Sequence, residues 1–329
     1  MSEKQAYDCA PVLLIGFNRP DFMAVQIAAV RAARPTRLYI AVDGAREGWP
    51  DEAEKCRAVR ECAKLVDWTC EVKTLFREKN HGCKMGVSGA ITWFFENEEE
   101  GIVLEDDCRP SPDFFRFVTE MLARYRDDER IGIVTGFNHF NLQSDKTASY
   151  HFSSHLDIWG WASWRRVWAK YDVTMEPYIG HADEVIGASA MTPYFKMFMR
   201  KGIQEVQAGQ CNTWDFQFAL AALSMKWLCV VPRRRLIANV GLTDGGATHT
   251  NGYNYYAESF ARVGKIDFPL AHPAAVVCDE RADLIRERME GAVFPRGLTW
   301  LGSKMPLLCP LLSVTGKIVE RIAPVLFRL

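Results

Sequence analysis

The chain has 329 residues, of which 48% are hydrophobic and 25% charged, and its formal net charge is -1. These values are ordinary for a folded protein that is long enough for one large α/β domain or two small ones. A chain so close to neutrality has no overall basic field, so its composition argues against binding to nucleic acid.

The first 135 residues predict strands that alternate with helices. Short apolar runs, rich in β-branched residues, predict strands at residues 11–17, 37–42, 70–76, 102–106 and 131–135. Asp21 is placed to cap the first helix. Helical spacing predicts helices at residues 22–34, 51–67, 84–96 and 112–125. This alternation is typical of a mostly parallel sheet wrapped by helices.

Polar residues stand at the ends of four of these predicted strands. Asn18, Asp43 and Arg77 follow the first three, and Asp107 follows the fourth. In parallel α/β sheets, ligands bind beyond the carboxyl ends of the strands. We therefore expect these four side chains to converge on one binding site.

The most informative run is residues 101–110, in which an apolar strand ends in Glu105, Asp106 and Asp107. Adjacent carboxylates repel one another and lose hydration when they are half-buried. A divalent cation offsets this cost, because hard cations take carboxylate oxygens as ligands. A metal at this point can hold a diphosphate and neutralise the charge of a leaving group. The alternative is a solvated acidic loop.

The pattern changes after about residue 150. Three tryptophans, Trp159, Trp161 and Trp164, fall within six residues. Flat apolar rings stack on the C–H faces of sugars, so this cluster predicts an acceptor site, with core packing as the alternative. If the segment is a strand, Trp159 and Trp161 lie on the same face.

The second half continues with mixed elements. Helical spacing at residues 183–201 is interrupted at Pro193, where we expect a break. A helix is predicted from 212 to about 225, and a short strand at 228–232. Residues 239–249 form a glycine-rich loop that ends in His249.

The last thirty residues differ again. Residues 305–312 are apolar but contain two prolines, and residues 314–329 have apolar residues at helical spacing, with a proline at position 324. Such a tail can lie on a membrane surface, pack on the domain or form a dimer contact. Ten scattered cysteines without a Cys-x-x-Cys pair, and no secretion signal, favour the cytoplasm. Peripheral membrane contact through residues 300–329 remains one option.

Four segments occur in the order seen in GT-A-fold glycosyltransferases. They are Asn-Arg-Pro at 18–20, Asp-Gly at 43–44, Arg-Glu-Lys-Asn-His-Gly at 77–82 and Leu-Glu-Asp-Asp at 104–107. The run 104–115 is similar to the Glu-Asp-Asp segment of N-acetylglucosaminyltransferase I and related bacterial sugar transferases, where Pro-Asp-Phe-Phe follows the acids. The resemblance covers residues 10–250 and implies a GT-A, Rossmann-like fold with a mostly parallel central sheet.

The resemblance also implies roles for matching residues. Asp43 resembles the aspartate that hydrogen-bonds the donor base, and Asp106 the residue that meets the ribose or the sugar. Asp107 resembles the direct ligand of Mn²⁺ or Mg²⁺. The donor site, for a nucleotide-diphospho-sugar that we expect to be UDP-linked, would comprise Asn18, Arg19, Asp43, Arg77, Glu105 and Asp106.

Two further residues complete the expected site. Asp215 follows Trp214 at the start of a helix and resembles the Trp-Asp segment that carries the general base in similar inverting enzymes. A helix-start acid that only accepts backbone hydrogen bonds is the alternative, and Asp157 and Asp244 are other candidate bases. His249 resembles a C-terminal histidine that ligates the metal or touches the diphosphate, and a surface loop histidine is its alternative.

These expectations combine into one functional hypothesis. Residues 1–150 would form the nucleotide-sugar-binding half of a GT-A domain, residues 151–275 its acceptor half, and residues 276–329 a C-terminal helical extension. The protein would be a metal-dependent, inverting glycosyltransferase acting on a hydroxyl of a glycan or lipid-linked acceptor. One alternative is a sugar-phosphate nucleotidyltransferase, which usually has a glycine-rich loop after the first strand. The other is a non-catalytic carbohydrate-binding or assembly protein.

Overall fold

A computed structural model describes residues 7–241 and 257–291 of the chain. The predicted metal ligand His249, the candidate base Asp244 and the tail at 300–329 lie outside these residues. Within the described part, no helix is both long enough and apolar enough to span a membrane.

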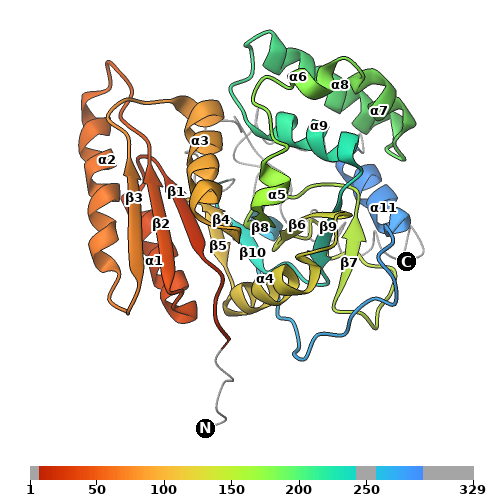
Figure 1. Cartoon of the computed structure of the whole chain (residues 1–329), viewed down its shortest axis with the longest axis horizontal. Coiled ribbons are helices and arrows are strands. Elements are labelled where there is room, and N and C mark those ends of the chain that lie inside the picture. The colour runs from red at the N-terminus through yellow and green to blue at the C-terminus, as the bar shows by residue number, and fades with distance from the viewer. Residues whose placement is uncertain (1–6, 242–256, 292–329) are drawn as a thin grey trace, which may run out of the picture.

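A sheet of eight strands forms the centre of the molecule (Figure 1). In spatial order the strands are β3 (Glu71–Phe76), β2 (Arg37–Val42), β1 (Val12–Gly16), β4 (Glu100–Glu105), β8 (Trp161–Trp164), β6 (Ile131–Thr135), β9 (Leu228–Pro232) and β7 (Tyr150–Ser153). Only β8 and β7 of these described strands run against the others. The predicted mostly parallel α/β sheet is therefore confirmed.

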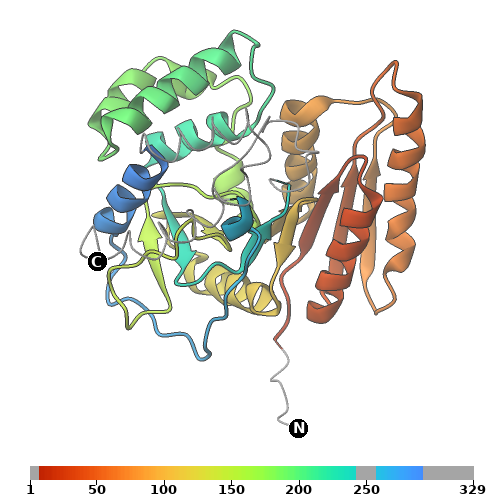
Figure 2. The same ribbon diagram turned by 180° about the vertical axis from the view of Figure 1, so that it is seen from behind.

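Helices cover both faces of the first half of the sheet. Helix α1 (Pro20–Ala33) packs against α2 (Pro50–Glu61), which continues into a 3₁₀ turn at Cys62–Leu65. The other face carries α3 (Gly82–Asn97), which packs on β1 and β4 (Figures 1 and 2). Helix α4 (Pro112–Tyr125) packs against α1 and under β4, β6 and β8.

The start of α1 differs from the prediction. The helix begins at Pro20, so Asp21 lies inside its first turn and makes no capping hydrogen bond. Proline is favoured at the first helical position because its φ angle is already helical and its missing N–H would be unpaired there. The predicted capping by Asp21 is therefore wrong, and the start of the helix is instead set by Pro20.

A second, smaller group of helices lies above the far half of the sheet (Figure 1). It comprises α6 (Glu176–Ile179), α7 (Ala182–Ala188), α8 (Pro193–Gln207) and α9 (Asp215–Met225), whereas α5 (Arg165–Trp168) follows β8 directly and contacts α3. The predicted break at Pro193 is confirmed, because α8 starts there and Thr192 caps it. Helices α6 to α9 share a hydrophobic cluster of their own, while Phe218 of α9 packs into the main core.

Two further elements shape the functional edge. Strand β5 (Cys108–Pro110) pairs in antiparallel register with β10 (Ile237–Asn239), which brings the acidic turn beside the residues that follow β10. A short helix, α10 (Ala257–Phe260), contacts β10, and α11 (Glu280–Gly291) packs against β7 and α8.

Candidate functional site

A cavity of about 400 Å³ opens at the carboxyl ends of β1 to β4. Apolar residues of the strands and α3 line it, including Ile15, Val42 and Leu75. Its polar lining residues are Asn18, Arg19, Asp43, Arg46, Arg77, Asn80, Glu105, Asp106 and Asn212. All six residues predicted for donor binding therefore surround one cavity, and Arg46, Asn80 and Asn212 were not expected from the sequence.

Asp43 fixes one end of this cavity. Its carboxylate accepts hydrogen bonds from the backbone N–H groups of Gly44 at 3.0 Å, His81 at 2.9 Å and Gly82 at 3.1 Å. His81 and Gly82 begin α3, where unpaired N–H groups and the helix dipole favour an anion. Asp43 thus ties the end of β2 to the start of α3.

Arg77 lies beside Asp43 and is held by α3. Its Nη1 donates to the backbone oxygen of Gly86 at 2.7 Å. Burial lowers the pKa of Arg77, an effect that Asp43 opposes. A Cβ atom on Gly86 would lie 3.0 Å from Asp43 Oδ2, and one on Gly89 would lie 2.7 Å from Arg77 Nη2. Two glycines one helical turn apart therefore make room for Asp43 and Arg77, a role that was not predicted from the sequence.

The acidic turn forms the other end of the cavity. Arg19 pairs with Asp106 through Nε at 3.2 Å and through Nη2. Asp106 is only 8% exposed, and burial raises its pKa to about 6, with Arg19 opposing the rise and Asp107 adding to it. Gln26 of α1 donates hydrogen bonds to the backbone oxygens of Glu105 and Cys108, which pins the turn.

Negative charge accumulates around Glu105. Burial raises the pKa of Glu105 well above its ordinary value, and Asp107, Asp106 and Asp215 raise it further. Asn212, three residues before the start of α9, lines the same cavity as Glu105 and Asp106, so the start of α9 lies close to this cavity. Such a group of carboxylates suits a hard divalent cation, which relieves their mutual repulsion.

Asp107 meets the segment that follows β10. Its backbone oxygen accepts a hydrogen bond from Val240 N at 3.0 Å, and Asn239 Nδ2 lies 3.5 Å from its Oδ2. A Cβ atom on Gly241 would lie 2.6 Å from Asp107 Oδ2, so glycine is required for this close approach. Across residues 7–241 and 257–291, no three His, Cys, Asp or Glu side chains are arranged as a complete metal site.

Asp215 stands in the first turn of α9. Its Oδ1 accepts hydrogen bonds from Thr213 Oγ1 at 2.7 Å and from Phe216 N at 2.8 Å. The preceding loop is fixed to α3, because Asn212 Oδ1 accepts a hydrogen bond from Lys84 N at 3.1 Å. The bond from Phe216 N fits the alternative in which Asp215 only accepts hydrogen bonds at the start of the helix, although Asp215 is not the cap residue of α9.

The tryptophan cluster does not form a shared sugar-binding face. Trp161 is fully buried (0% exposed), where it stacks on Trp214 at 6.0 Å and packs on Phe218 at 5.5 Å. Trp159 precedes the strand, because Gly160 has a φ angle of +65° that turns the chain before β8. The expectation for Trp161 is therefore corrected to core packing, since the hydrophobic effect favours burying its indole among these rings.

Trp159 has a different environment. It is partly buried, and its ring lies edge-on to Phe137 at 4.7 Å and stacked with His139 at 5.8 Å. Because β8 begins opposite the ends of β4 and β6, Trp159 lies at the same edge of the sheet as the acidic turn.

The candidate base Asp157 belongs to a separate ionic network. It is 7% exposed, and its carboxylate pairs with His139 Nε2 and Arg286 Nη1, both at 2.9 Å. Burial alone would raise its pKa, but Arg286 and His139 hold it below the usual range. These two ion pairs explain how a charged carboxylate is accommodated in the interior, so its burial needs no catalytic explanation.

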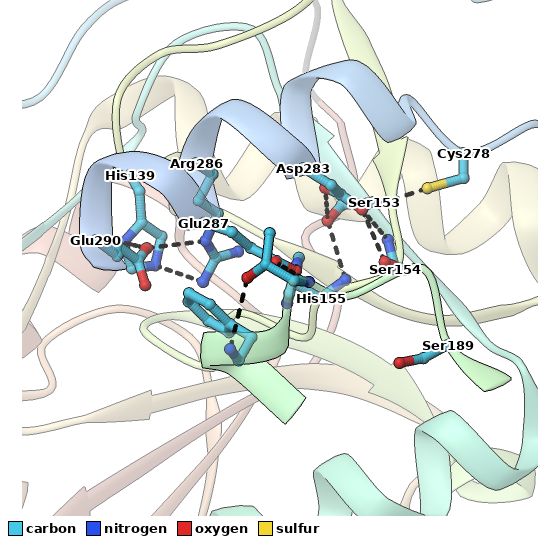
Figure 3. Close-up of polar contacts among 12 residues, drawn as sticks. His139, Ser153, Ser154, His155, Ser189, Cys278, Asp283, Arg286, Glu287 and Glu290 are labelled. Atoms are coloured by element: carbon cyan, nitrogen blue, oxygen red, sulfur yellow. Dashed lines mark hydrogen bonds and ion pairs between the residues drawn. The ribbon is translucent and has the colours of Figure 1, made fainter. Parts of the chain in front are cut away.

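The network fastens α11 to the sheet (Figure 3). Glu290 pairs with Arg286 Nε at 3.0 Å and His139 Nδ1 at 2.9 Å, and Glu287 pairs with His155 Nε2 at 2.8 Å. Asp283 accepts hydrogen bonds from the hydroxyls of two serines, Ser153 and Ser154. Apart from the Arg286–Glu290 pair within α11, these contacts join segments more than a hundred residues apart and leave no local pattern in the sequence.

We expect Arg286→Gln to lower the free energy of unfolding at pH 7 by about 3–5 kcal/mol, because it removes the guanidinium that pairs with the buried Asp157 and Glu290 and leaves the two carboxylates to share His139. Urea unfolding measures the loss, and Arg288→Gln on the exposed face of α11 is the control. Losses of equal size in the two variants would contradict the network's role.

The same network predicts acid sensitivity. The pKa values of Asp157, Asp283 and Glu290 are all held below their usual range. Their contribution to stability is therefore complete above the unfolded pKa of about 4 and is lost as the pH falls through the lower folded values. The difference between the wild type and Arg286→Gln is expected to shrink below pH of about 4; a difference that stays constant down to acid unfolding would oppose this account.

No protein-family profile matches the chain, and no curated protein is similar to it. Among solved structures, HddC from Yersinia pseudotuberculosis is similar over 49% of this chain and 80% of its own, with 8% identity and a TM-score of 0.31. A UDP-glucose pyrophosphorylase complexed with UDP-glucose is similar over 68% of this chain and 90% of its own, with 8% identity and a TM-score of 0.36. Similarity at this level assigns neither a family nor an activity.

Proposed function

We propose that the chain is a metal-dependent glycosyltransferase that binds a nucleotide-diphospho-sugar in the cavity and passes the sugar to a hydroxyl of a glycan or lipid-linked acceptor. The observation that carries the proposal is the convergence of six expected donor residues, from the ends of β1 to β4, around one cavity. The cavity's volume of about 400 Å³ falls in the range of small-molecule sites.

The lining of the cavity suggests how a donor would lie. Val42, Leu75 and Val87 give the cavity an apolar lining on which the nucleotide base of a donor would pack, next to Asp43 and Arg77. Asp43 accepts hydrogen bonds from the backbone N–H groups of His81 and Gly82 at the start of α3. Its role would therefore be to fix the position of these N–H groups beside the cavity. Asp106, held by Arg19, would meet the ribose or the sugar.

The acidic turn supports the chemical step. Asp107 would hold Mn²⁺ or Mg²⁺, together with oxygens of the diphosphate and, by resemblance, His249, and the cation would stabilise the leaving phosphate. Asp215, near the acidic turn, would take the proton of the acceptor hydroxyl as general base. Trp159 would contribute an aromatic face to the acceptor side. Inversion at the transferred carbon is favoured, because the sequence offers a candidate base and no evident covalent nucleophile.

A sugar-phosphate nucleotidyltransferase remains the second candidate, because that reaction also binds a nucleotide and a sugar phosphate beside a divalent cation. The loop after β1, Gly16-Phe17-Asn18-Arg19-Pro20, has a single glycine and does not favour it. A non-catalytic carbohydrate-binding protein is the third.

Product analysis separates the three candidates. Labelled UDP-sugars, MnCl₂ and a mixture of glycan and lipid-linked acceptors are incubated with the protein, with and without pyrophosphate. The transferase releases UDP and needs no pyrophosphate, whereas the nucleotidyltransferase forms UTP and a sugar 1-phosphate only when pyrophosphate is present. Glycan binding without either product supports the non-catalytic protein.

Gly89→Ala tests the part of the cavity beside Arg77, where the nucleotide base is proposed to bind. The new methyl group would lie 2.7 Å from Arg77 Nη2 and displace that guanidinium. We expect UDP affinity, measured by calorimetry, to fall about tenfold, equivalent to about 1.4 kcal/mol. The helix itself should not weaken, since alanine has the higher helix propensity.

Gly187→Ala in α7 is the matched control, because the nearest atom to its new methyl group lies 3.8 Å away. It is expected to bind UDP as the wild type does. Wild-type UDP affinity in Gly89→Ala would remove Arg77 from the proposed donor site.

A further inference from the structure

Glu52 lies behind the wall of the cavity and does not line it. This residue of α2 is only 4% exposed, although it is a carboxylate. A buried carboxylate is costly unless its oxygens are paired. The partners of Glu52 therefore indicate what it is for.

Both partners of Glu52 do line the cavity. Asn18 Nδ2 donates a hydrogen bond to Glu52 Oε1 at 2.9 Å. Arg46 donates from Nε to both oxygens, at 3.1 Å and 3.0 Å, and from its backbone N to Oε2 at 2.8 Å. The side-chain hydrogen bonds from Arg46 are the main reason why the pKa of Glu52 lies below its usual range, and the bond from Asn18 adds to this effect. Glu52 is thus an ionised carboxylate that joins the end of β1 to the loop after β2.

Two aromatic rings add to the restraint on Arg46. Its guanidinium carbon lies 4.5 Å from the ring centre of Trp49 and 5.6 Å from that of Phe17. Trp49 is 58% exposed, so this pair stands at the surface of the molecule. The planar guanidinium is therefore fixed by a carboxylate at one edge and by rings at its faces.

The remaining polar atoms of the two partners are available to a ligand. Among the described residues, none forms a hydrogen bond with Asn18 Oδ1 or with Arg46 Nη1. One acceptor and one cationic donor are thus held in fixed positions beside the cavity. Groups fixed before binding lose less conformational entropy when a ligand arrives.

We propose that Glu52 is a positioning residue for the nucleotide: it does not touch the ligand, but it holds Asn18 and Arg46 in the orientation in which both bind it. The identity of the ligand as a nucleotide rests on the proposed function, whereas the restraint of Arg46 by Glu52 does not depend on it. A residue that acts through others is expected to change ligand affinity and to leave the chemical step unchanged at saturating donor.

The first test compares Glu52→Gln with Glu61→Gln, an exposed glutamate on the same helix. Calorimetry with UDP and MnCl₂ is expected to show about tenfold weaker binding for Glu52→Gln and wild-type binding for Glu61→Gln. The KM for donor should rise in Glu52→Gln with kcat unchanged. Wild-type UDP affinity in Glu52→Gln overturns the inference while leaving the proposed function intact.

A double-mutant cycle shows whether Glu52 acts through Arg46. Since Arg46→Gln removes the cation that Glu52 positions and leaves Glu52 to act through Asn18 alone, the loss of UDP affinity in the double variant is expected to be clearly smaller than the sum of the two single losses. Additive losses would mean that Glu52 acts by another route and would overturn the inference. Arg46→Lys, which keeps a cation beside Glu52, provides a second measurement if Arg46→Gln does not fold.

A ligand-free experiment tests the restraint itself. Phenylglyoxal modifies arginine, and peptide mass spectrometry gives the rate at Arg46. We expect at least a severalfold faster modification in Glu52→Gln than in the wild type or Glu61→Gln. If the wild type binds no UDP but Arg46 is released in Glu52→Gln, the proposed function fails and the restraint stands. An unchanged rate at Arg46 overturns the inference whatever the protein binds.

Discussion

Asp107→Asn is expected to reduce sugar transfer by roughly 10²–10³-fold, the range seen when a group that stabilises transition-state charge is removed. The side chain keeps its shape, so the close contacts with Asn239 and Gly241 persist. What is lost is the anionic ligand that would hold the cation. Steady-state rates with a UDP-sugar and MnCl₂ measure the loss.

The matched control is Asp183→Asn in α7, an exposed aspartate paired with Arg200. It removes the same charge from the chain and is expected to transfer at the wild-type rate. Transfer by Asp107→Asn at the rate of Asp183→Asn, with the same dependence on MnCl₂, would show that the metal is held elsewhere.

Asp215→Asn is expected to lower kcat by roughly 10²–10⁴-fold, the usual contribution of a general base, and to leave UDP affinity unchanged. The amide oxygen of asparagine can still accept from Thr213 Oγ1 and Phe216 N, so the start of α9 should keep its structure. Only the capacity to take a proton is lost. Single-turnover transfer and calorimetry with UDP separate the two effects.

Glu205→Gln on α8 is the control for Asp215→Asn, because Glu205 is a partly exposed acid paired with Lys201. Its kcat is expected to match the wild type. If Asp215→Asn also transfers normally, Asp215 has only the capping role that its hydrogen bonds describe, and another carboxylate must serve as base.

The strands and the convergence of polar residues could be predicted because they depend on local patterns. A run such as 102–104 is apolar at every position, as a strand buried on both faces requires. Parallel strands bring their carboxyl ends to one edge, so Asn18, Asp43 and Arg77 could be placed together before any contact was known.

The spatial order of the second half could not be predicted in the same way. Strand β7 is only four residues long, is buried at its polar as well as its aromatic positions, and pairs with β9 about eighty residues later. Strand β8 inserts between β4 and β6 in the opposite direction. Pairings between distant segments leave no local signal, so the sheet order appears only in three dimensions.

Periodicity also cannot distinguish a sugar-binding tryptophan from a core tryptophan. Trp161 is buried by Trp214, just before α9, and by Phe218 of α9, both more than fifty positions away. Glu52 and Arg46 are close in the sequence, yet the acidic start of α2 resembles a solvated helix face. Their pairing depends on the loop after β2 folding back onto α2, which no local pattern in the sequence specifies.

A donor site formed by the cavity and the acidic turn requires a metal at the acidic turn for nucleotide binding. The measurement is the thermal unfolding of the wild type and Asp107→Asn in the presence of nucleotides and UDP-sugars, each with and without MnCl₂. The account predicts a rise in the melting temperature of the wild type with one nucleoside diphosphate plus MnCl₂, and no such rise in Asp107→Asn. No rise with any nucleotide, with or without MnCl₂, would contradict it and favour a carbohydrate-binding protein without transferase activity.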